Sequence, residues 1–320
     1  MKTIGILTSG GDAPGMNAAV RAVVRSAFVK GMKVFGIRRG YQGLIKDDMF
    51  EMELRSVSDI IQCGGTMLYT ARSVEFNSPE GVAKAVKICK KRGIEGIVVI
   101  GGDGSFRGAR DLSASGIPCV GIPATIDNDL ACTDYTIGFD TAMNTATQMV
   151  DLLRVTSESH DRCSVVEVMG RRAGYLALQT GISVGATAIL VPEVEYNVDK
   201  DVISRIKKSM KTNKRHFIVI VAEGIGMVND LSDYIYQKTG IECRPTILGH
   251  VQRGGVPTVT DRVMASRMGC HAVGLLAKGI GNRVVVLDHS QIKDIDIFEA
   301  LAMTKEFDKK LYQVARDISV

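Results

Sequence analysis

The sequence contains no tryptophan, and aromatic residues make up only 5% of its 320 residues. It therefore offers no obvious aromatic platform for nucleic-acid bases. Its net charge of +5 is too small and too dispersed to favour nucleic acid, and polyanionic small molecules fit it better. It also lacks any apolar run near the roughly 20 residues of a membrane span. The apolar run after Met1 is too short for a signal peptide, so we expect a cytoplasmic protein.

The seven cysteines include no C-x-x-C pair, and their number is odd. Both facts disfavour a zinc site and a disulfide framework. Most cysteines are therefore expected to be small buried side chains in a reducing compartment. The hydrophobic fraction of 45% and the charged fraction of 23% are ordinary for a soluble globular protein, and the length suggests one large or two medium domains.

Hydrophobic runs that end abruptly in glycine-rich or polar loops are the main feature that is present. Segment 97–129 is the clearest case, because two buried-strand runs flank a helix-length segment, as in a βαβ unit. Strands are expected at 3–7, 34–37, 97–100, 119–122, 164–169, 189–191, 217–222 and 283–287. Helices are expected at 16–29, 79–92, 140–154 and 260–276, with a turn at 41–43 and two short helices at the end. This alternation predicts an α/β fold with doubly wound units.

The two loops of 97–129 should emerge at the same sheet edge, where open α/β sheets bind ligands. In the first loop, glycines around Asp103 and Ser105 let backbone N–H groups approach a large anion at the start of a helix. Asp103 is also a hard oxygen ligand, suited to Mg²⁺ that touches phosphates. The second loop holds Asp127 and Asp129, one of which could take a proton from an attacking hydroxyl. Either loop alone could simply form turns and caps, but their convergence favours a site.

Other candidates are weaker when taken singly. The loop 9–15 again joins a strand to a helix through glycines, but it is neither a Walker A loop nor a G-x-G-x-x-G motif. Arg21 and Arg25 share one helix face and are either solvated or an anion clamp. Arg72 lies in a glycine-bounded loop that suits phosphate, although most loop arginines are merely solvated. His250 and Arg253 share a loop with two glycines at a strand end, which favours a functional role.

Read together, five motifs resemble the bacterial 6-phosphofructokinase family. They are TSGGDAPG at 8–15, GGDGS at 101–105, PATIDND at 123–129, MGR at 169–171 and GHVQRGG at 249–255. The resemblance implies two doubly wound Rossmann-like domains of three layers each, with the active site in the cleft between them. It assigns 1–138 plus 251–303 to ATP and 139–250 plus 304–320 to fructose 6-phosphate. It also implies a homotetramer that uses MgATP to phosphorylate the 1-hydroxyl of fructose 6-phosphate.

The resemblance also implies roles for individual residues. Asp127 looks like the general base, Asp103 like the Mg²⁺ ligand, and Asp129 like a support of the same region. The residues placed like donors to the transferring phosphoryl group are Gly11, Arg72 and Arg171. Further nucleotide contacts are implied at Tyr41, Ser73, Gly102, Gly104, Ser105 and Gly108.

Contacts with the sugar phosphate are implied in the same way. Those to the sugar are Thr125, Ile126, Met169, Gly170, Glu223, Val251 and Gln252, and Thr125 also counts among the catalytic residues. The 6-phosphate cluster is Arg162, Arg244, His250 and Arg253, with Arg162 and Arg244 reaching in from the neighbouring subunit. On this reading the active site is incomplete in a monomer.

A second, regulatory site for ADP or phosphoenolpyruvate is also implied. Its retained positions are Arg21, Arg25, Asp59, Arg154, Gly185, Lys214, Arg215 and His216. Thr187 stands where a glutamate is usual, Leu54 where some members have an arginine, and Thr212 replaces a further basic residue. These departures predict a weak or altered effector response.

Departures elsewhere bear on the choice of phosphoryl donor. Ala124 replaces a usual glycine, while pyrophosphate-using relatives carry Lys there and Asp where Gly104 stands, so ATP is favoured. Tyr175 and Val256 also differ from the common pattern. The alternatives are a pyrophosphate-dependent or broader sugar-phosphate kinase, and a regulatory paralogue without turnover, against which the intact Asp127 argues.

Overall fold

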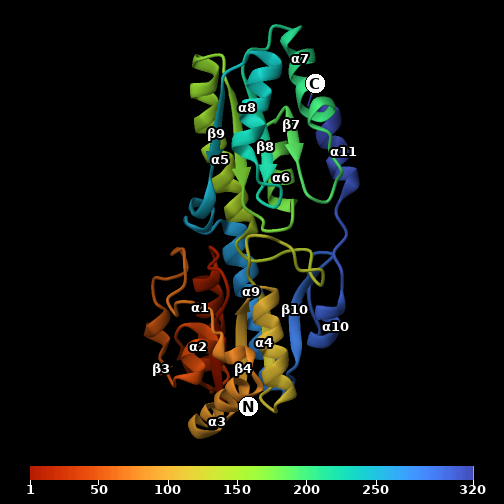
Figure 1. The fold of residues 1–320 in the computed structure, drawn as a ribbon. Helices are drawn as coiled ribbons and strands as arrows, with labels where there is room; N and C mark the ends of the chain where they lie inside the picture. Colours follow the sequence, from red (N-terminus) through yellow and green to blue (C-terminus); the bar gives the residue numbers. More distant parts are fainter. Residues whose placement is uncertain (320) are drawn as a thin grey trace. The chain divides into compact units, whose positions relative to one another are not determined.

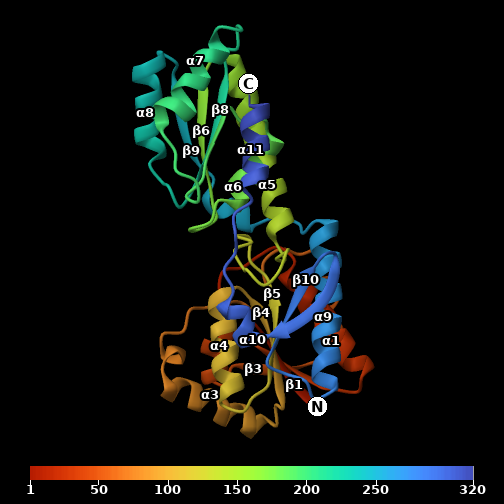
Figure 2. The same cartoon turned by 90° about the vertical axis from the view of Figure 1, so that its right-hand side faces the viewer.

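The computed structural model describes residues 1–319, which form two compact units (Figures 1 and 2). Unit 1 comprises 1–126, 130–141 and 253–305, and unit 2 comprises 127–129, 142–252 and the chain from 306 onward. The domain boundaries expected from the resemblance remain a prediction, since the structure divides the chain at slightly different residues. No helix among residues 1–319 has the length and apolar character that crossing a membrane requires.

Unit 1 is built on a seven-stranded sheet of order β11-β10-β5-β4-β1-β2-β3. Its strands are β1 (Thr3–Thr8), β2 (Lys33–Ile37), β3 (Met49–Met52), β4 (Gly96–Gly101), β5 (Cys119–Pro123), β10 (Arg283–Asp288) and β11 (Gln291–Asp296). The five inner strands are parallel, and the two edge strands pair antiparallel to their neighbours. The chain leaves β1 towards β2 and returns beyond β1 as β4, which makes the β1–β4 gap the topological switch point.

Helices cover both faces of this sheet, as Figure 2 shows. The helices of unit 1 are α1 (Met16–Val29), α2 (Gly40–Ile45), α3 (Pro79–Arg92), α4 (Asp103–Ala114), α9 (Val259–Ala277), α10 (Ile297–Ala302) and the start of α5 (Phe139–Ser159), with 3₁₀ turns η1 (Leu54–Val57) and η2 (Glu75–Asn77). Helices α1 and α9 pack together on one face, and α3, α4 and α10 lie on the other. Because both faces are covered, β4 and β5 are buried throughout, as expected for parallel strands.

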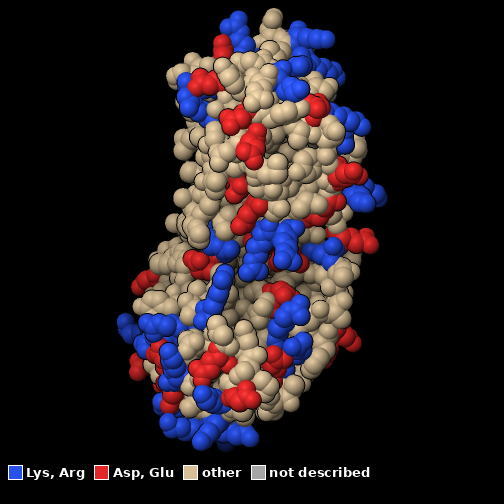
Figure 3. All heavy atoms as spheres, viewed as in Figure 1, with Lys and Arg blue, Asp and Glu red and all other residues tan. Residues whose placement is uncertain are grey.

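Helix α3 shows how closely local sequence sets the limits of an element. Ser78 caps its start by accepting a hydrogen bond from Gly81 N, and Gly93 ends it with φ 66°, a left-handed conformation that suits glycine. Its apolar residues, including Val82 and Cys89, face the core, while its basic residues are exposed. They form the blue surface at the bottom of Figure 3, so this helix presents a basic face to solvent.

Unit 2 contains a four-stranded parallel sheet of order β7-β8-β6-β9. Its strands are β6 (Cys163–Val168), β7 (Ala188–Leu190), β8 (Phe217–Ala222) and β9 (Cys243–Ile247). Its helices are most of α5, α6 (Tyr175–Ser183), the π-helical η3 (Asp199–Ile203), α7 (Ser204–Met210), α8 (Val228–Thr239) and α11 (Lys309–Ile318), with the 3₁₀ turn η4 (Gly249–Arg253) at its border. Helix α8 lies on one face, and α5, α6 and α11 lie on the other (Figure 2). The expected second doubly wound unit is confirmed.

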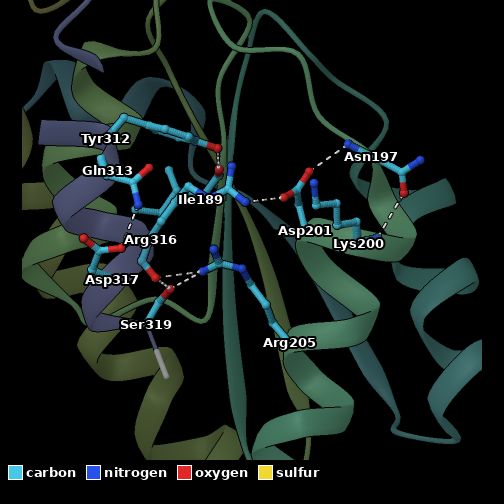
Figure 4. Close-up of polar contacts among 10 residues, drawn as sticks. All are labelled: Ile189, Asn197, Lys200, Asp201, Arg205, Tyr312, Gln313, Arg316, Asp317 and Ser319. Carbon is cyan, nitrogen blue, oxygen red and sulfur yellow. Dashed lines mark hydrogen bonds and ion pairs between the residues drawn. The ribbon is translucent and has the colours of Figure 1, made fainter. Parts of the chain in front are cut away.

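The last helix, α11, closes the edge strand β7 by polar contacts (Figure 4). Tyr312 Oη donates to the Ile189 carbonyl at 3.1 Å, which satisfies an edge acceptor that would otherwise be open. Arg316 pairs with Asp201 at 3.1 Å, and Arg205 donates to the Arg316 carbonyl at 3.4 Å. The C-terminal segment is therefore part of the body of unit 2.

Some predicted elements were wrong or missing. The turn expected at 41–43 is part of helix α2, where Gly43 is required because a Cβ would overlap the Arg38 carbonyl oxygen. The edge strands β3 and β11 were not predicted, since their mixed polar sequences lack the buried-strand pattern. Helix α5 also extends to Ser159, five residues beyond the predicted end.

Candidate functional site

The loops after β1, β4 and β5 meet at one edge of the unit 1 sheet. Ser9 N donates to the Ile100 carbonyl at 3.0 Å, and Ala124 N donates to the Gly101 carbonyl at 2.9 Å. A Cβ on Gly101 would overlap the Ser9 carbonyl oxygen, so only glycine permits this approach. The predicted convergence of the loops that follow β4 and β5 is confirmed where Ala124 contacts Gly101, and the loop at 9–15, for which no convergence was predicted, joins them at the same edge.

The start of helix α4 has the features of an anion site. No side chain within residues 1–319 caps this helix end. Ser105 N donates to the Gly102 carbonyl at 3.0 Å, which leaves the N–H groups of Asp103 and Gly104 at the uncapped end. Ser105 is 3% exposed, and its Oγ has no hydrogen-bond partner in the described chain. A Cβ on Gly104 would meet nothing within 4 Å among the same residues. Uncapped N–H groups, an unpartnered buried hydroxyl and open space over a glycine suit phosphate oxygens.

Asp103, the first residue of α4, holds both of its carboxylate oxygens against Arg107. The distances are 2.9 Å from Nε to Oδ2 and 3.2 Å from Nη2 to Oδ1, and both side chains are about half exposed. The described residues contain no cluster of three or more His, Cys, Asp or Glu side chains that could hold a metal. A Mg²⁺ ion at Asp103 would therefore take most of its oxygen ligands from phosphates and water, as Mg²⁺ usually does in kinases.

Two predicted nucleotide contacts support α4 from inside. Tyr41 is 6% exposed, stacks on Phe76 with ring centroids 4.1 Å apart, and donates from Oη to the Ser105 carbonyl at 2.5 Å. Burial raises the pKa of the Tyr41 hydroxyl well above its usual value, so it stays a proton donor. Gly108 admits the Tyr41 ring, because a Cβ there would lie 2.6 Å from it. In this structure both residues fix the first turn of α4.

The N-terminal glycine loop gathers several predicted groups. Arg253 Nη1 donates to the Asp12 carbonyl at 3.0 Å, and a Cβ on Gly11 would lie 2.6 Å from the same nitrogen. Thr70 Oγ1 donates to the Gly10 carbonyl at 2.7 Å, which brings the segment with Arg72 and Ser73 to this loop. The side chain of Arg72 is exposed, and Ser73 Oγ accepts a hydrogen bond from Phe76 N at 3.2 Å.

The loop after β5 carries a buried carboxylate next to an arginine. Asp127 is 3% exposed, and its Oδ2 lies 3.9 Å from Arg171 Nε. Asn128 has φ 48° and Arg171 has φ 55°, a left-handed backbone that is uncommon outside glycine. Left-handed non-glycine residues also occur elsewhere, for example at His289 and Ser290, so the buried Asp127 beside Arg171 distinguishes this position rather than the backbone alone. Thr125 and Ile126, which immediately precede Asp127 and were also predicted to belong to the site, are buried. Asp129 is half-buried.

Glu223, at the end of β8, supports the loop that presents Arg171. Its Oε2 accepts hydrogen bonds from Gly170 N at 3.1 Å and from Arg171 N at 2.9 Å. On the other side of the same loop, Gln252 Oε1 accepts a hydrogen bond from Met169 N at 3.0 Å. Gln252 is fully buried, yet its Nε2 has no partner among residues 1–319, so it can donate to a ligand or a water. The neighbouring His250 and Val251 are exposed in η4.

Arg162 and Arg244 lie at the other end of the unit 2 sheet. Arg162 precedes β6, and Arg244 pairs in register with Ser164 near the start of that strand. Both arginines bind Glu242, at 2.9 and 2.5 Å, a role that was not predicted from the sequence. The loop with Met169 follows the last residue of β6, roughly 20 Å away at about 3.3 Å per strand residue. The two arginines and the Met169 loop are therefore not brought together within unit 2.

The predicted effector residues fall into one group in each unit. In unit 1, Arg21 and Arg25 lie on α1, and Asp59 (φ 56°) follows η1, which packs on α1. In unit 2, burial and the nearby Arg154 lower the pKa of Lys214. The other members in unit 2 are Gly185, Arg215 and His216, of which Arg215 pairs with Asp161 at 3.6 Å.

Thr187 stands where a glutamate is usual at this predicted effector site. Its side chain is uncharged and only 2% exposed. Its Oγ1 has no hydrogen-bond partner within the described chain.

Comparison with known proteins gives consistent matches. The family model described as Phosphofructokinase matches residues 3–276. Proteins named ATP-dependent 6-phosphofructokinase from Clostridioides difficile (strain 630) and Clostridium botulinum (strain Loch Maree / Type A3) are each 57% identical, over 320 and 319 residues, with full coverage of both chains.

Solved structures agree. The phosphofructokinase of Saccharomyces cerevisiae is 33% identical with a TM-score of 0.89, covering all of this chain and 48% of its own. The pyrophosphate-dependent phosphofructokinase of Marinobacter aquaeolei, at 22% identity and a TM-score of 0.86 over 96% of this chain and 86% of its own, shares the fold.

Proposed function

The chain belongs to the phosphofructokinase family, and we propose how its loops perform the family's reaction. The reaction is phosphoryl transfer from ATP to the 1-hydroxyl of fructose 6-phosphate, which gives fructose 1,6-bisphosphate and ADP, a step of glycolysis. The observation that carries the assignment of roles is the buried Asp127 carboxylate 3.9 Å from Arg171, on a backbone that is left-handed at both Asn128 and Arg171. We also propose a cytoplasmic location, since glycolytic enzymes work there.

The nucleotide phosphates bind at the start of α4. The N–H group of Gly104, the unpartnered Ser105 Oγ and the open space at Gly104 match phosphate oxygens. The residues fit Mg²⁺ as well, because Asp103 offers a carboxylate beside this position. When bound, Mg²⁺ supplies charge neutralisation for the phosphates. Asp103 must then exchange its bidentate contact with Arg107 for the metal.

Asp127 accepts the proton of the sugar 1-hydroxyl as that oxygen attacks the phosphorus. Arg171, held by the Glu223 carboxylate through its own N–H and that of Gly170, donates to the charge that develops on the transferring group. Gly11 N–H and Arg72 donate to the same group, and Thr125 and Asp129 flank the base. Catalysis then rests mainly on positioning and on fixed hydrogen-bond donors.

The sugar phosphate is held by groups at the Met169–Arg171 loop and in η4. Gln252 Nε2 is buried and still able to donate, and His250 is exposed in the same turn. Arg162 and Arg244 lie roughly 20 Å from the Met169 loop along β6, so they serve a site other than their own chain's. This supports a homotetramer in which each active site takes both arginines from a neighbouring subunit.

An effector response is proposed to be weak. Lys214 and Arg154 lie close enough for their charges to interact, which leaves a site for a phosphate-bearing ligand such as ADP or phosphoenolpyruvate. Thr187 offers no charge, and its side chain is buried. Binding alone does not regulate, because an effector must bind two states with different affinity.

A coupled assay with fructose 6-phosphate, comparing MgATP with Mg-pyrophosphate, tests the function. We expect turnover with ATP and little with pyrophosphate. Comparable turnover with pyrophosphate would assign the chain to pyrophosphate-dependent enzymes. Tight ATP binding without any turnover would identify a regulatory paralogue.

A further inference from the structure

Asp261 is a buried carboxylate that lies outside the predicted site. It occupies the first turn of α9 and is 0% exposed. No lysine, arginine or histidine in the described chain forms an ion pair with it. A buried charge without a cation is costly, and a neutral residue would fill this place at lower cost. The presence of a carboxylate at this place therefore requires another explanation.

The carboxylate gathers four donors from one segment, 135–141. Oδ1 accepts from Tyr135 Oη at 2.5 Å and from Gly138 N at 2.6 Å. Oδ2 accepts from Thr141 N at 2.9 Å and from Thr141 Oγ1. Two of the donors are backbone N–H groups, which can only donate, so both oxygens are needed as acceptors. Asp261 thus fixes the backbone of this segment at two positions.

The same segment in turn holds the β5 end. Ile137 N donates to the Pro123 carbonyl at 3.0 Å, and Thr136 Oγ1 donates to the Thr125 carbonyl at 2.6 Å. Ala124 and Ile137 form an isolated parallel bridge. The chain from Pro123 to Thr125 is therefore held on its free side by residues 136–137, and Asp127 follows two residues later. We call Asp261 together with segment 135–141 the clamp.

The clamp also reaches the N-terminal glycine loop. Gly15 has φ 103°, and a Cβ there would lie 2.6 Å from Ile137 Cγ2 and 3.4 Å from Asp261 Cβ. The end of the loop 9–15 thus packs directly on the segment that Asp261 fixes. One buried carboxylate serves both a predicted phosphate loop and the loop of the predicted base.

We propose that Asp261 is a positioning residue for the phosphoryl-transfer reaction, acting through segment 135–141 on the Pro123–Asp127 loop. This rests on the proposed role of Asp127. An error of about 1 Å in placing a reacting group costs about 100-fold in rate. A loosened clamp therefore lowers kcat more than it raises the KM of either substrate.

Asp261→Asn tests the proposal with a side chain of the same shape. In either orientation of the amide, one N–H of Gly138 or Thr141 faces an NH₂ group and loses its acceptor. We expect faster amide hydrogen exchange in peptides covering 123–141, and a kcat lower by about 10- to 100-fold, with KM values within about threefold. Asp294→Asn is the matched control, since Asp294 lies on β11 and binds Arg283 on β10 and His271 on α9.

Two further variants keep the test decisive if Asp261→Asn does not fold. Thr141→Val removes at constant shape the hydroxyl that donates to Asp261 and accepts from Thr258 N, whereas Thr141→Ser keeps it, so only the first should raise exchange at 123–128 and lower kcat. Unchanged exchange and kcat in folded Asp261→Asn or Thr141→Val would overturn the proposal, as would equal losses in Asp294→Asn. Hydrogen exchange needs no substrate, so it reports on the clamp even if the wild-type protein lacks the proposed activity.

Discussion

Replacing Gly104 with aspartate should move stability and activity in opposite directions. The Cβ would meet nothing within 4 Å in the described chain, and the backbone of Gly104 is helical with negative φ. The position is the second residue of α4, where an acidic side chain interacts favourably with the helix dipole by about 0.3–1 kcal/mol. Loss of a helical glycine adds a further gain of similar size. The folded state should therefore tolerate Gly104→Asp or be stabilised by it.

Nucleotide binding should suffer for the same geometric reason. A carboxylate about 4 Å from a phosphate charge is repelled by about 4 kcal/mol at an effective dielectric constant near 20. This corresponds to roughly a 1,000-fold loss in kcat/KM for ATP, reduced to the extent that Mg²⁺ neutralises the phosphates.

Two neutral substitutions separate charge from bulk. Gly104→Ala adds only a Cβ, and Gly104→Asn adds the volume of aspartate without its charge. We expect Ala to behave nearly as wild type, Asn to be intermediate, and Asp to be the most impaired. Steady-state kinetics with varied MgATP, together with thermal unfolding of each variant, measure both effects. An unchanged kcat/KM for ATP in Gly104→Asp would refute the placement of the phosphates. A loss of activity that follows a lower Tm would refute the claim of open space.

Three other predictions concern the base, the shared site and the effectors. Asp127→Ser should keep its melting temperature and ATP affinity while kcat falls by about 10²–10⁴; near-normal turnover would remove Asp127 from the mechanism. Arg244→Ser and Asp127→Ser chains, each weakly active, should regain activity when mixed and reassembled, because hybrid oligomers contain some intact sites; hybrids that form without regaining activity would argue for self-contained sites. ADP and phosphoenolpyruvate should change the half-saturating fructose 6-phosphate concentration by less than about tenfold, because the uncharged Thr187 contributes no charge-assisted contact of about 1.5–3 kcal/mol. A larger shift at sub-millimolar effector would show that Arg154 and Lys214 suffice.

The strand-end loops could be predicted from the sequence because their signal is local. A buried run such as 97–100 that stops at glycines predicts both the strand and the residue at which it ends. The same reasoning missed β3 and β11, since an edge strand is exposed on one side and carries mixed residues such as the QIKDID of 291–296. It also misread α2, where Gly40 and Gly43 are typical of a turn, but Gly43 is there because the Arg38 carbonyl leaves no room for a Cβ.

Roles that depend on tertiary contacts could not be read in this way. The pattern T-x-x-D at Thr258 and Asp261 fits a helix start, and Thr258 does accept a hydrogen bond from Asp261 N. Nothing in that pattern says that the carboxylate turns inward to Tyr135, Gly138 and Thr141. Glu242, which holds Arg162 and Arg244, gives only the local signal of an acidic residue two positions before an arginine.

The two carboxylates Asp103 and Asp127 lie in different surroundings, and their proposed roles follow from this difference. Asp103 is half exposed at a helix start and already binds a cation, Arg107, so exchanging this partner for Mg²⁺ costs little desolvation. Asp127 is 3% exposed beside one arginine at 3.9 Å, a distance too long for a hydrogen bond. A general base is best placed away from bulk water and beside the groups that orient the reacting hydroxyl, and Asp127 is the more buried of the two carboxylates. We therefore propose Asp103 for the metal and Asp127 for the proton, because Mg²⁺ usually keeps several water ligands and the half-exposed Asp103 leaves room for them.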